Sequence, residues 1–210
     1  MDHQLERITF QEPVPVELLQ THWSRYVWAL RYCVGQSVLD VGCGCGYGTW
    51  LLSTVAESVI GIDPSPEAIG DARSTFSDAS FLQCSIEDFT GGPFGVIVAF
   101  EVVEHCEDVD AVVKKIASLL APNGTALISL PLYQPSEYHH HRDFGYDQWS
   151  EVLEGHFQIT GVCYQDNEHP EGNNVCLKAV MYHGQVDWSE ASLRFEPDSG
   201  NVIFVCRRMP

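Results

Sequence analysis

The sequence has few basic residues for its length, and this shortage limits the partners that the protein can have. It contains 11 Lys and Arg against 29 Asp and Glu among 210 residues, which gives a formal net charge of −18 at pH 7. Adjacent basic residues occur as isolated pairs, Lys114-Lys115 and Arg207-Arg208, and form no basic patch. Because a negative field repels polyanions, the composition disfavours nucleic acid and anionic membrane surfaces as partners.

Long hydrophobic runs are also missing, and the first residues do not resemble a signal peptide. No apolar stretch approaches the length of a transmembrane helix. Residues 1–4, Met-Asp-His-Gln, have neither the basic nor the apolar region of a signal peptide. The eight cysteines form no CxxC pair, and several fall in predicted strands or in a glycine-rich loop. Scattered thiols of this kind are typical of reduced, buried cysteines, so the sequence predicts a cytoplasmic protein without membrane association.

The chain contains no internal repeat and no low-complexity segment. Its 45% hydrophobic and 11% aromatic residues are typical of a globular protein, and 210 residues are enough for one α/β core. Pro13 and Pro15 indicate that residues 1–15 are an extended lead-in. We therefore predict a single domain over residues 16–210.

The most informative stretch is residues 38–49, Val-Leu-Asp-Val-Gly-Cys-Gly-Cys-Gly-Tyr-Gly-Thr. It begins as the short apolar run of a buried parallel strand and then has glycines at alternate positions before a helical pattern starts. Glycine is needed where a backbone turns sharply and touches a ligand, because it has no Cβ. Asp40 lies at the end of this strand. Asp63 ends the next one, seventeen residues after Gly46, where its carboxylate can accept hydrogen bonds from a ribose diol.

Alternating strand and helix patterns continue on both sides of this stretch. They imply a parallel sheet with right-handed crossovers, in which ligands bind at the carboxyl ends of the strands. Ser85 and Glu101 follow two further strands, so they should meet Asp40 and Asp63 in one crevice. The predicted helices span 16–34, 47–57, 64–76, 109–120 and 147–155, and the predicted strands span 37–41, 59–62, 80–83, 95–100, 125–130, 157–164 and 201–206, with 174–181 open between strand and helix.

On these motifs the sequence resembles the class I S-adenosylmethionine-dependent methyltransferases. The pattern of this family, an acid followed by glycines at alternate positions, is met by Asp40, Gly42, Gly44 and Gly46. A nicotinamide dinucleotide enzyme would need GxGxxG spacing, and an acid before the loop would repel a pyrophosphate but suits the cationic methionine end of the methyl donor. The resemblance implies an α/β fold: a Rossmann-like, doubly wound, mostly parallel seven-stranded sheet with an antiparallel last strand and helices on both faces.

The resemblance also implies which residues bind the methyl donor. The helix over 16–34 would cover the cofactor as a lid and place Arg25 or Tyr26 near the methionine carboxylate, with a surface arginine and a packed tyrosine as the alternative. The residues expected to contact S-adenosyl-L-methionine, or the product S-adenosyl-L-homocysteine, are Arg25, Tyr26, Asp40, Gly42, Gly44, Gly46, Asp63, Pro64, Ser85, Ile86 and Phe100.

One of these positions departs from the family pattern. Relatives usually have an acid that contacts the adenine amino group where this chain has Ser85. A serine hydroxyl can still form a hydrogen bond there. Glu87 or Asp88 could also replace the missing acid, or could be solvated.

A second motif follows the strand over 95–100 directly. It reads Glu101-Val102-Val103-Glu104-His105, and one helical turn would place the two Glu and the His on the same face. Two carboxylates and an imidazole in one crevice repel and desolvate each other unless a cation joins them. A further cluster over residues 139–144, His-His-His-Arg-Asp-Phe, could reach the same face.

With these two motifs, the sequence is similar to the branch that contains the ubiquinone-biosynthesis O-methyltransferase and many sugar and natural-product methyltransferases. The small-RNA 3′-terminal 2′-O-methyltransferases share the ExxEH element and a later His. The resemblance implies that Glu101, Glu104, His105 and His140 bind a divalent cation such as Mg²⁺ or Mn²⁺. Many relatives with this element have no demonstrated metal, so a metal-free site with His105 as the base and a purely structural role are the alternatives.

The predicted activity is therefore O-methylation of a small molecule or sugar, at a vicinal diol or catechol. Glu101 and the metal would lower the pKa of the attacking hydroxyl, and His105 or His140 would take its proton. Residues 131–145 and 166–198 are expected to shape the acceptor pocket. An RNA 2′-O-methyltransferase, a C- or N-methyltransferase and a non-catalytic cofactor-binding protein remain alternatives, and both a monomer and a homodimer are compatible with the sequence.

Overall fold

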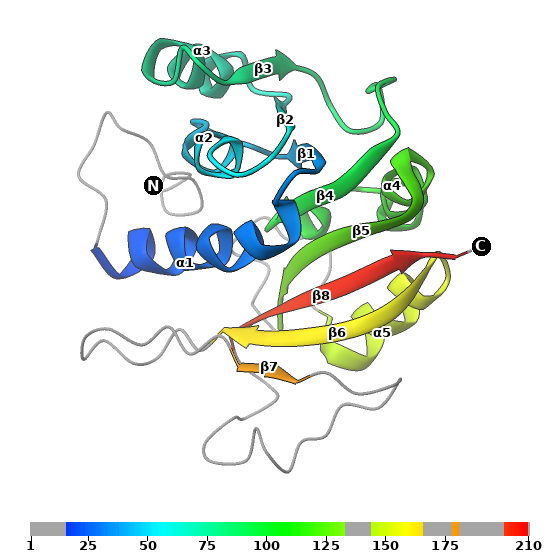
Figure 1. Cartoon of the computed structure of the whole chain (residues 1–210). Helices are drawn as coiled ribbons and strands as arrows, with labels where there is room; N and C mark the ends of the chain where they lie inside the picture. The colour runs from blue at the N-terminus through cyan, green and yellow to red at the C-terminus, as the bar shows by residue number, and fades with distance from the viewer. Residues whose placement is uncertain (1–15, 133–143, 166–177, 181–199, 210) are drawn as a thin grey trace.

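The computed structural model describes residues 16–132, 144–165, 178–180 and 200–209, which form a mixed sheet with helices on both faces (Figure 1). The helical elements are α1 (Val16–Cys33), α2 (Tyr47–Ser53), α3 (Pro66–Thr75), the 3-10 turn η1 (Val103–His105), α4 (Val109–Leu119) and α5 (Tyr146–Glu154). The strands are β1 (Ser37–Val41), β2 (Ser58–Asp63), β3 (Ser80–Gln83), β4 (Phe94–Phe100), β5 (Leu120–Pro131), β6 (Phe157–Gln165), β7 (Lys178–Val180) and β8 (Asn201–Arg208).

The sheet has the strand order β3-β2-β1-β4-β5-β8-β6-β7. Strands β1 to β5 pair in parallel, whereas β8 lies antiparallel between β5 and β6. This arrangement confirms the predicted doubly wound sheet with an antiparallel last strand. The short β7 is an additional strand at the edge beyond β6, and it falls within the segment that the sequence left open between strand and helix.

The central strand β4 is buried on both faces of the sheet. Val96 and Val98 pack with α1 and α2 on one face, while Ile97 and Ala99 pack with α4 and α5 on the other. A strand covered on both sides has no polar face, which is why this segment is an almost uninterrupted apolar run in the sequence. Because β1 to β5 are parallel, their carboxyl ends lie at the same edge of the sheet, where ligands bind in folds of this type.

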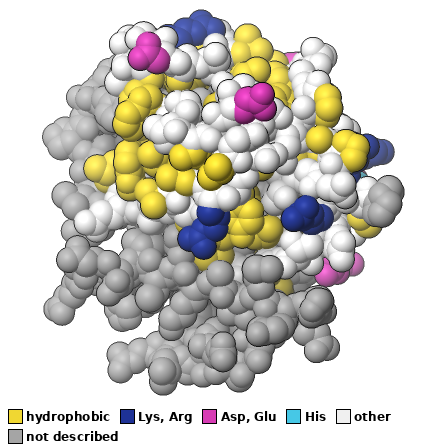
Figure 2. Space-filling model, viewed as in Figure 1, with side chains coloured by type: hydrophobic (Ala, Val, Ile, Leu, Met, Phe, Trp, Pro, Cys, Tyr) yellow, Lys and Arg dark blue, Asp and Glu magenta, His cyan; other side chains and the backbone are white. Residues whose placement is uncertain are grey.

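Helix α1 carries apolar side chains on two sides. Ala29 and Cys33 are fully buried against the sheet. On the outer side, Leu19, Trp23 and Val27 repeat every fourth residue and are 38 to 46% exposed. Figure 2 shows apolar side chains gathered on this face of the molecule, where α1 and α2 lie.

Local signals in the sequence fix the start of α4 but not the end of α2. Asp108 is the predicted N-cap of α4, and its carboxylate accepts a hydrogen bond of 3.0 Å from the N–H of Ala111. The predicted end of α2 at Glu57 is wrong, because the helix ends at Ser53. The N–H of Glu57 donates instead to the carbonyl of Gln36 at 3.0 Å, so this residue already belongs to the connection into β2.

Several predictions concern residues that lie outside the described ranges. They are the lead-in over 1–15, His140, and most of the two segments expected to shape the acceptor pocket, 131–145 and 166–198. Within the described ranges, no helix combines the length and apolar character needed to cross a bilayer.

Candidate active site

A pocket of about 710 Å³ lies at the carboxyl ends of β1, β2 and β4, with α1 on one side and η1 on the other. Its size is within the range of small-molecule sites. Glu101 and His105 line it, whereas Asp40, Gly46 and Glu104 do not. The predicted donor-binding residues on its wall are Arg25, Tyr26, Gly42, Gly44, Asp63, Pro64, Ser85, Ile86 and Phe100.

The three glycines of the loop have different structural roles. Gly42, Gly44 and Gly46 all have positive φ angles, of 67°, 53° and 88°, which favour glycine. A Cβ on Gly42 would overlap Val102, and a Cβ on Gly46 would lie 2.7 Å from the side chain of Ala72. A Cβ on Gly44 would meet nothing within 4 Å. The first and third glycines therefore permit close packing, and the middle one leaves open space at the pocket wall.

Asp63 supports this loop from the end of β2. One carboxylate oxygen accepts a hydrogen bond of 3.0 Å from the N–H of Gly44, and the other accepts one of 2.8 Å from the N–H of Ser65. Each carboxylate oxygen has a second lone pair, so both can accept a further hydrogen bond. The position at the pocket wall is compatible with the predicted contact to a ribose diol.

Asp40 lies behind the pocket. Its side chain is fully buried, and it accepts hydrogen bonds from the hydroxyls of Thr49 at 2.6 Å and Tyr26 at 3.1 Å. Burial raises the pKa of this carboxyl group to about 7, although both hydrogen bonds oppose the increase. Asp40 therefore joins α1 and α2 to β1, and it is connected to the pocket wall through Tyr26, which does line the pocket.

His22 and Tyr47 line the pocket as well, although the sequence analysis gave neither of them a role. His22 Nδ1 lies 3.2 Å from the hydroxyl of Tyr47. Burial, together with the nearby Arg25, lowers the pKa of His22 to about 3, so the imidazole is neutral near pH 7. The spacing of His22, Arg25 and Tyr26 places all three on one face of a helix, and this was the signal that could have identified His22.

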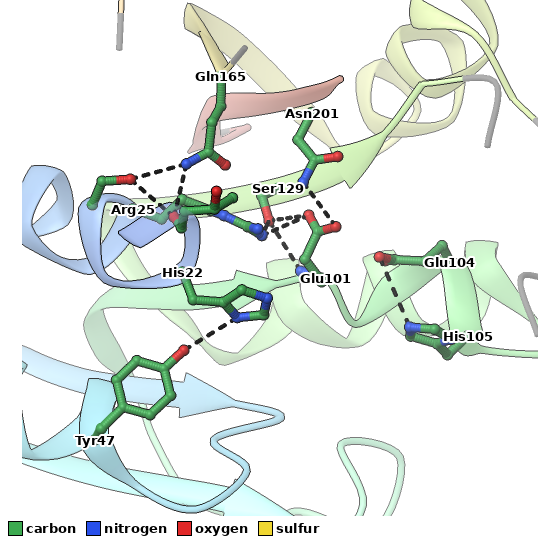
Figure 3. Close-up of polar contacts among 11 residues, drawn as sticks. His22, Arg25, Tyr47, Glu101, Glu104, His105, Ser129, Gln165 and Asn201 are labelled. Carbon is green, nitrogen blue, oxygen red and sulfur yellow. Dashed lines mark hydrogen bonds and ion pairs between the residues drawn. The ribbon is translucent and has the colours of Figure 1, made fainter. Parts of the chain in front are cut away.

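Glu101 is the centre of a polar network that joins four elements (Figure 3). It follows β4 with a left-handed backbone, φ 55°, which is rare for a residue with a side chain. One carboxylate oxygen lies 2.9 Å from Arg25 Nη1 and accepts a hydrogen bond of 2.6 Å from the Ser129 hydroxyl. The other oxygen accepts one of 3.1 Å from the Asn201 amide. The network connects α1, the end of β4, β5 and β8.

Three of the four residues predicted to bind a divalent cation lie within the described ranges, and they do not share one face. The turn η1 spans Val103–His105, so Glu101 precedes it and does not share its face as predicted. Glu104 is fully buried, and its carboxylate lies 4.0 Å from His105 Nε2. A cation at Glu101 would have to share that carboxylate with the guanidinium of Arg25. Among the described residues, no three His, Cys, Asp or Glu side chains are arranged to hold a metal ion.

The charged side chains that line the pocket are mainly acidic. Among the described residues on its wall, Arg25 is the one Lys or Arg side chain. A wall of this charge favours a cationic ligand, such as the sulfonium of the predicted donor. The carboxylates on the wall belong to Asp63, Glu87, Glu101, Glu107 and Asp108.

Ser85 lies on the wall near the end of β3, where the sequence predicted the adenine. Its hydroxyl donates to the Asp88 carboxylate at 3.2 Å and accepts from the N–H of Asp88 at 3.3 Å. Ile86 is buried and lines the pocket beside it. The adenine contact predicted for Ser85 therefore requires its hydroxyl to turn away from Asp88 or to accept an additional hydrogen bond.

Comparison with known proteins identifies the family. A family model described as a methyltransferase domain matches residues 29–169. The ubiquinone biosynthesis O-methyltransferase of Azorhizobium caulinodans is 31% identical over 119 residues, which cover 54% of this chain and 47% of that protein. The corresponding protein of Bradyrhizobium diazoefficiens is 37% identical over 113 residues, which cover 51% and 44%. The chain thus spans about half the length of the curated relatives that it matches.

The fold comparison agrees with the sequence comparison. The crystal structure of the N-methyltransferase NodS from Bradyrhizobium japonicum WM9, bound to S-adenosyl-L-homocysteine, superimposes with a TM-score of 0.64 at 19% identity. The superposition covers 90% of this chain and 88% of NodS. From the family match over more than half of its residues and from the observed sheet, we conclude that this chain belongs to the class I S-adenosylmethionine-dependent methyltransferases.

Proposed function

We propose that this protein transfers a methyl group from S-adenosyl-L-methionine to a hydroxyl group of a small molecule or sugar, at a catechol or a vicinal diol. The observation that carries the proposal is that the glycine loop, Asp63 and His105 line the same pocket. A donor bound along the loop and an acceptor beside the imidazole would then share one chamber. The names of the relatives, ubiquinone biosynthesis O-methyltransferases, support a hydroxyl acceptor.

The main contribution of the protein to this reaction is alignment. The sulfonium of the donor is already activated, so the acceptor oxygen has to lie about 3 Å from the methyl carbon and in line with the departing sulfur. Asp63 would hold the ribose, and Arg25 would hold the carboxylate at the methionine end. The acidic wall favours the positive charge that the donor carries before transfer.

His105 is the proposed acceptor of the hydroxyl proton. Its side chain is 33% exposed and lines the pocket, and its Nε2 lies 4.0 Å from the buried carboxylate of Glu104. A neighbouring carboxylate stabilises the imidazolium that forms when the base takes a proton. Glu104 would therefore support His105 from outside the pocket.

A divalent cation held by Glu101, Glu104, His105 and His140 is the alternative route to the same product. It would require the Glu101 carboxylate to bind the ion as well as the guanidinium of Arg25. In the proposed reaction His105 takes the proton directly, so EDTA should leave the rate unchanged. A rate that EDTA abolishes and that Mg²⁺ or Mn²⁺ restores would support the metal route instead.

The proposal is tested with a panel of catechols, vicinal-diol glycosides and amines, with S-adenosyl-L-homocysteine release as the signal and mass spectrometry of the products. We expect methylation of a hydroxyl, and a decrease of kcat by about 100-fold or more in His105→Ala without a change in donor affinity. His156→Ala is the matched control, because this histidine pairs with Asp110 and does not line the pocket. Preferred methylation of amines, or full activity of His105→Ala, would contradict the proposal.

A further inference from the structure

We infer that Glu101 positions Arg25 for the methyl donor and does not act as a ligand of a cation. In this role it holds the guanidinium at the wall of the pocket, where the carboxylate at the methionine end of the donor would meet it. The inference rests on donor binding, which the family shares, and is independent of the proposed hydroxyl acceptor.

The hydrogen bonds around Glu101 connect the same few side chains to one another. Its carboxylate receives N–H or O–H groups from Arg25, Ser129 and Asn201, which come from three different elements. The Ser129 hydroxyl also accepts hydrogen bonds from the N–H of Glu101 at 3.0 Å and from Arg25 Nη1 at 3.3 Å. Each group thus has a defined donor or acceptor role, which fixes the guanidinium and the carboxylate relative to each other.

Arg25 lies at the pocket wall and retains hydrogen-bonding capacity beyond its contacts to Glu101 and Ser129. Its side chain is 3% exposed, and it lines the pocket. Its Nε is buried and has no hydrogen-bond partner among the residues that the structure describes. A buried guanidinium needs a compensating charge, which Glu101 supplies, and a fork of N–H groups binds a carboxylate with good geometry. Glu101 therefore balances the charge of Arg25, while some N–H groups of the guanidinium remain available to hydrogen-bond a ligand.

The backbone of Glu101 explains why its side chain faces α1. The left-handed conformation, φ 55°, lets both its N–H and its carboxylate reach Ser129. A strained backbone conformation is kept only where the surrounding contacts stabilise it, and such positions are concentrated at functional sites. The carboxylate therefore contacts Arg25 in α1, Ser129 in β5 and Asn201 in β8. It does not face the side of η1 that carries the His of the motif.

A double-mutant cycle tests the inference through the affinity for S-adenosyl-L-homocysteine, measured by calorimetry with and without EDTA. We expect Glu101→Gln and Arg25→Met each to weaken binding by about 10- to 100-fold, equally in EDTA. Since both act through one guanidinium, the double variant should bind no more weakly than Arg25→Met alone. The double variant should also unfold at a higher temperature than Glu101→Gln, because it leaves no unpaired buried cation. Glu57→Gln, an exposed carboxylate outside the pocket, is the control.

Three results would overturn the inference. They are wild-type affinity in Glu101→Gln, additive losses in the double variant, and a loss of Mg²⁺ or Mn²⁺ binding in Glu101→Gln at unchanged donor affinity. If Glu101→Gln does not fold, Ser129→Ala takes its place, since it removes one contact to the carboxylate and keeps the pair of Arg25 and Glu101. It should weaken binding by about 2- to 10-fold, and an unchanged affinity would count against the inference. Failure of the proposed hydroxyl acceptor would leave all of these affinities as expected.

Discussion

Two carboxylates near the carboxyl ends of the neighbouring strands β1 and β4 have opposite surroundings. Asp40 is hidden behind the pocket and meets two neutral hydroxyls, of Thr49 and Tyr26, so burial raises its pKa to about 7. Glu101 lies at the pocket wall and has the guanidinium of Arg25 at 2.9 Å. The partner, and not the position on the sheet, therefore decides whether a buried acid has a compensating charge.

The same helix supplies both partners. Tyr26 and Arg25 are adjacent in α1, and one reaches Asp40 while the other reaches Glu101. Gln165 in β6 adds a third connection, a hydrogen bond of 2.8 Å to the carbonyl of Thr21. The helix that the sequence predicted as a lid is thus attached to β1, β4 and β6, and neutralising either acid should affect how it packs.

The sharpest test of the comparison is the stability of Glu101→Gln against that of Asp40→Asn at pH 8. Removing the charge of Glu101 leaves the guanidinium of Arg25 buried without its counter-ion, and we expect a loss on the order of 3 kcal/mol. Removing the charge of Asp40 relieves a desolvated carboxylate, so its effect should lie between zero and a gain of about 2 kcal/mol. Chemical denaturation measures both, and similar losses in the two variants would contradict the difference drawn between these acids.

The glycine loop after β1 and the ExxEH motif after β4 also contact each other at Gly42. A Cβ there would overlap Val102 in the ExxEH motif, and the φ of 67° disfavours any side chain, so we expect Gly42→Ala to cost about 2–3 kcal/mol. Gly70→Ala is the matched control. This helical glycine has nothing within 4 Å of its Cβ position, and the change should stabilise by up to about 1 kcal/mol.

Both the overlap with Val102 and the backbone conformation disfavour a side chain at Gly42. A second variant separates these two causes. Adding Val102→Ala to Gly42→Ala removes the overlapping methyl groups and should restore part of the stability lost on thermal unfolding. An unchanged loss in the double variant would show that the backbone conformation alone is responsible, and that the glycine loop and the ExxEH motif are not coupled by packing.

The pH dependence of stability should reveal Asp40. Its folded pKa of about 7 lies above the ordinary value of 3.8, so the folded state binds the extra proton between these values. Its contribution is present below pH 3.8 and is lost as the pH rises towards 7, by about 2 kcal/mol between pH 5 and 7. Asp40→Asn should not show this loss when the free energies of unfolding at pH 5 and pH 7 are compared. A difference identical to that of the wild type would mean that Asp40 is ionised in the folded protein at pH 5.

His22 should produce a smaller effect with the opposite sign. Its folded pKa of about 3 lies below the ordinary 6.5, so stability is lost as the pH falls from 6.5 towards 3. Since its side chain is only partly buried, we expect about 1 kcal/mol between pH 7 and 5. His22→Gln should abolish that part of the acid sensitivity, and NMR titration of the imidazole gives the pKa directly. A pKa near 6.5 would refute the neutral His22.

Much of the fold follows from patterns that are local in the chain. The strand over 37–41 has the predicted bounds, because an apolar run flanked by glycine or polar residues identifies a buried strand without further information. The strand over 80–83 also has the predicted bounds, although Phe81 is its one buried residue. The end of α2 was missed, since the carbonyl that binds the N–H of Glu57 belongs to Gln36, which local periodicity does not connect to it. The shared face predicted for the ExxEH motif is absent, because the prediction assumed a regular helical turn, whereas Glu101 has a left-handed backbone and precedes η1.

The sequence by itself determined the doubly wound sheet and the loop of alternating glycines, and it gathered Asp63, Ser85 and Glu101 at one edge, because parallel strands all end on the same side. Only the tertiary structure decided what each acid meets there. It placed Tyr26 and Thr49 on Asp40, and Arg25, Ser129 and Asn201 on Glu101. These partners lie up to 100 residues away along the chain, and no local rule of spacing or propensity specifies which distant side chains will share a buried site.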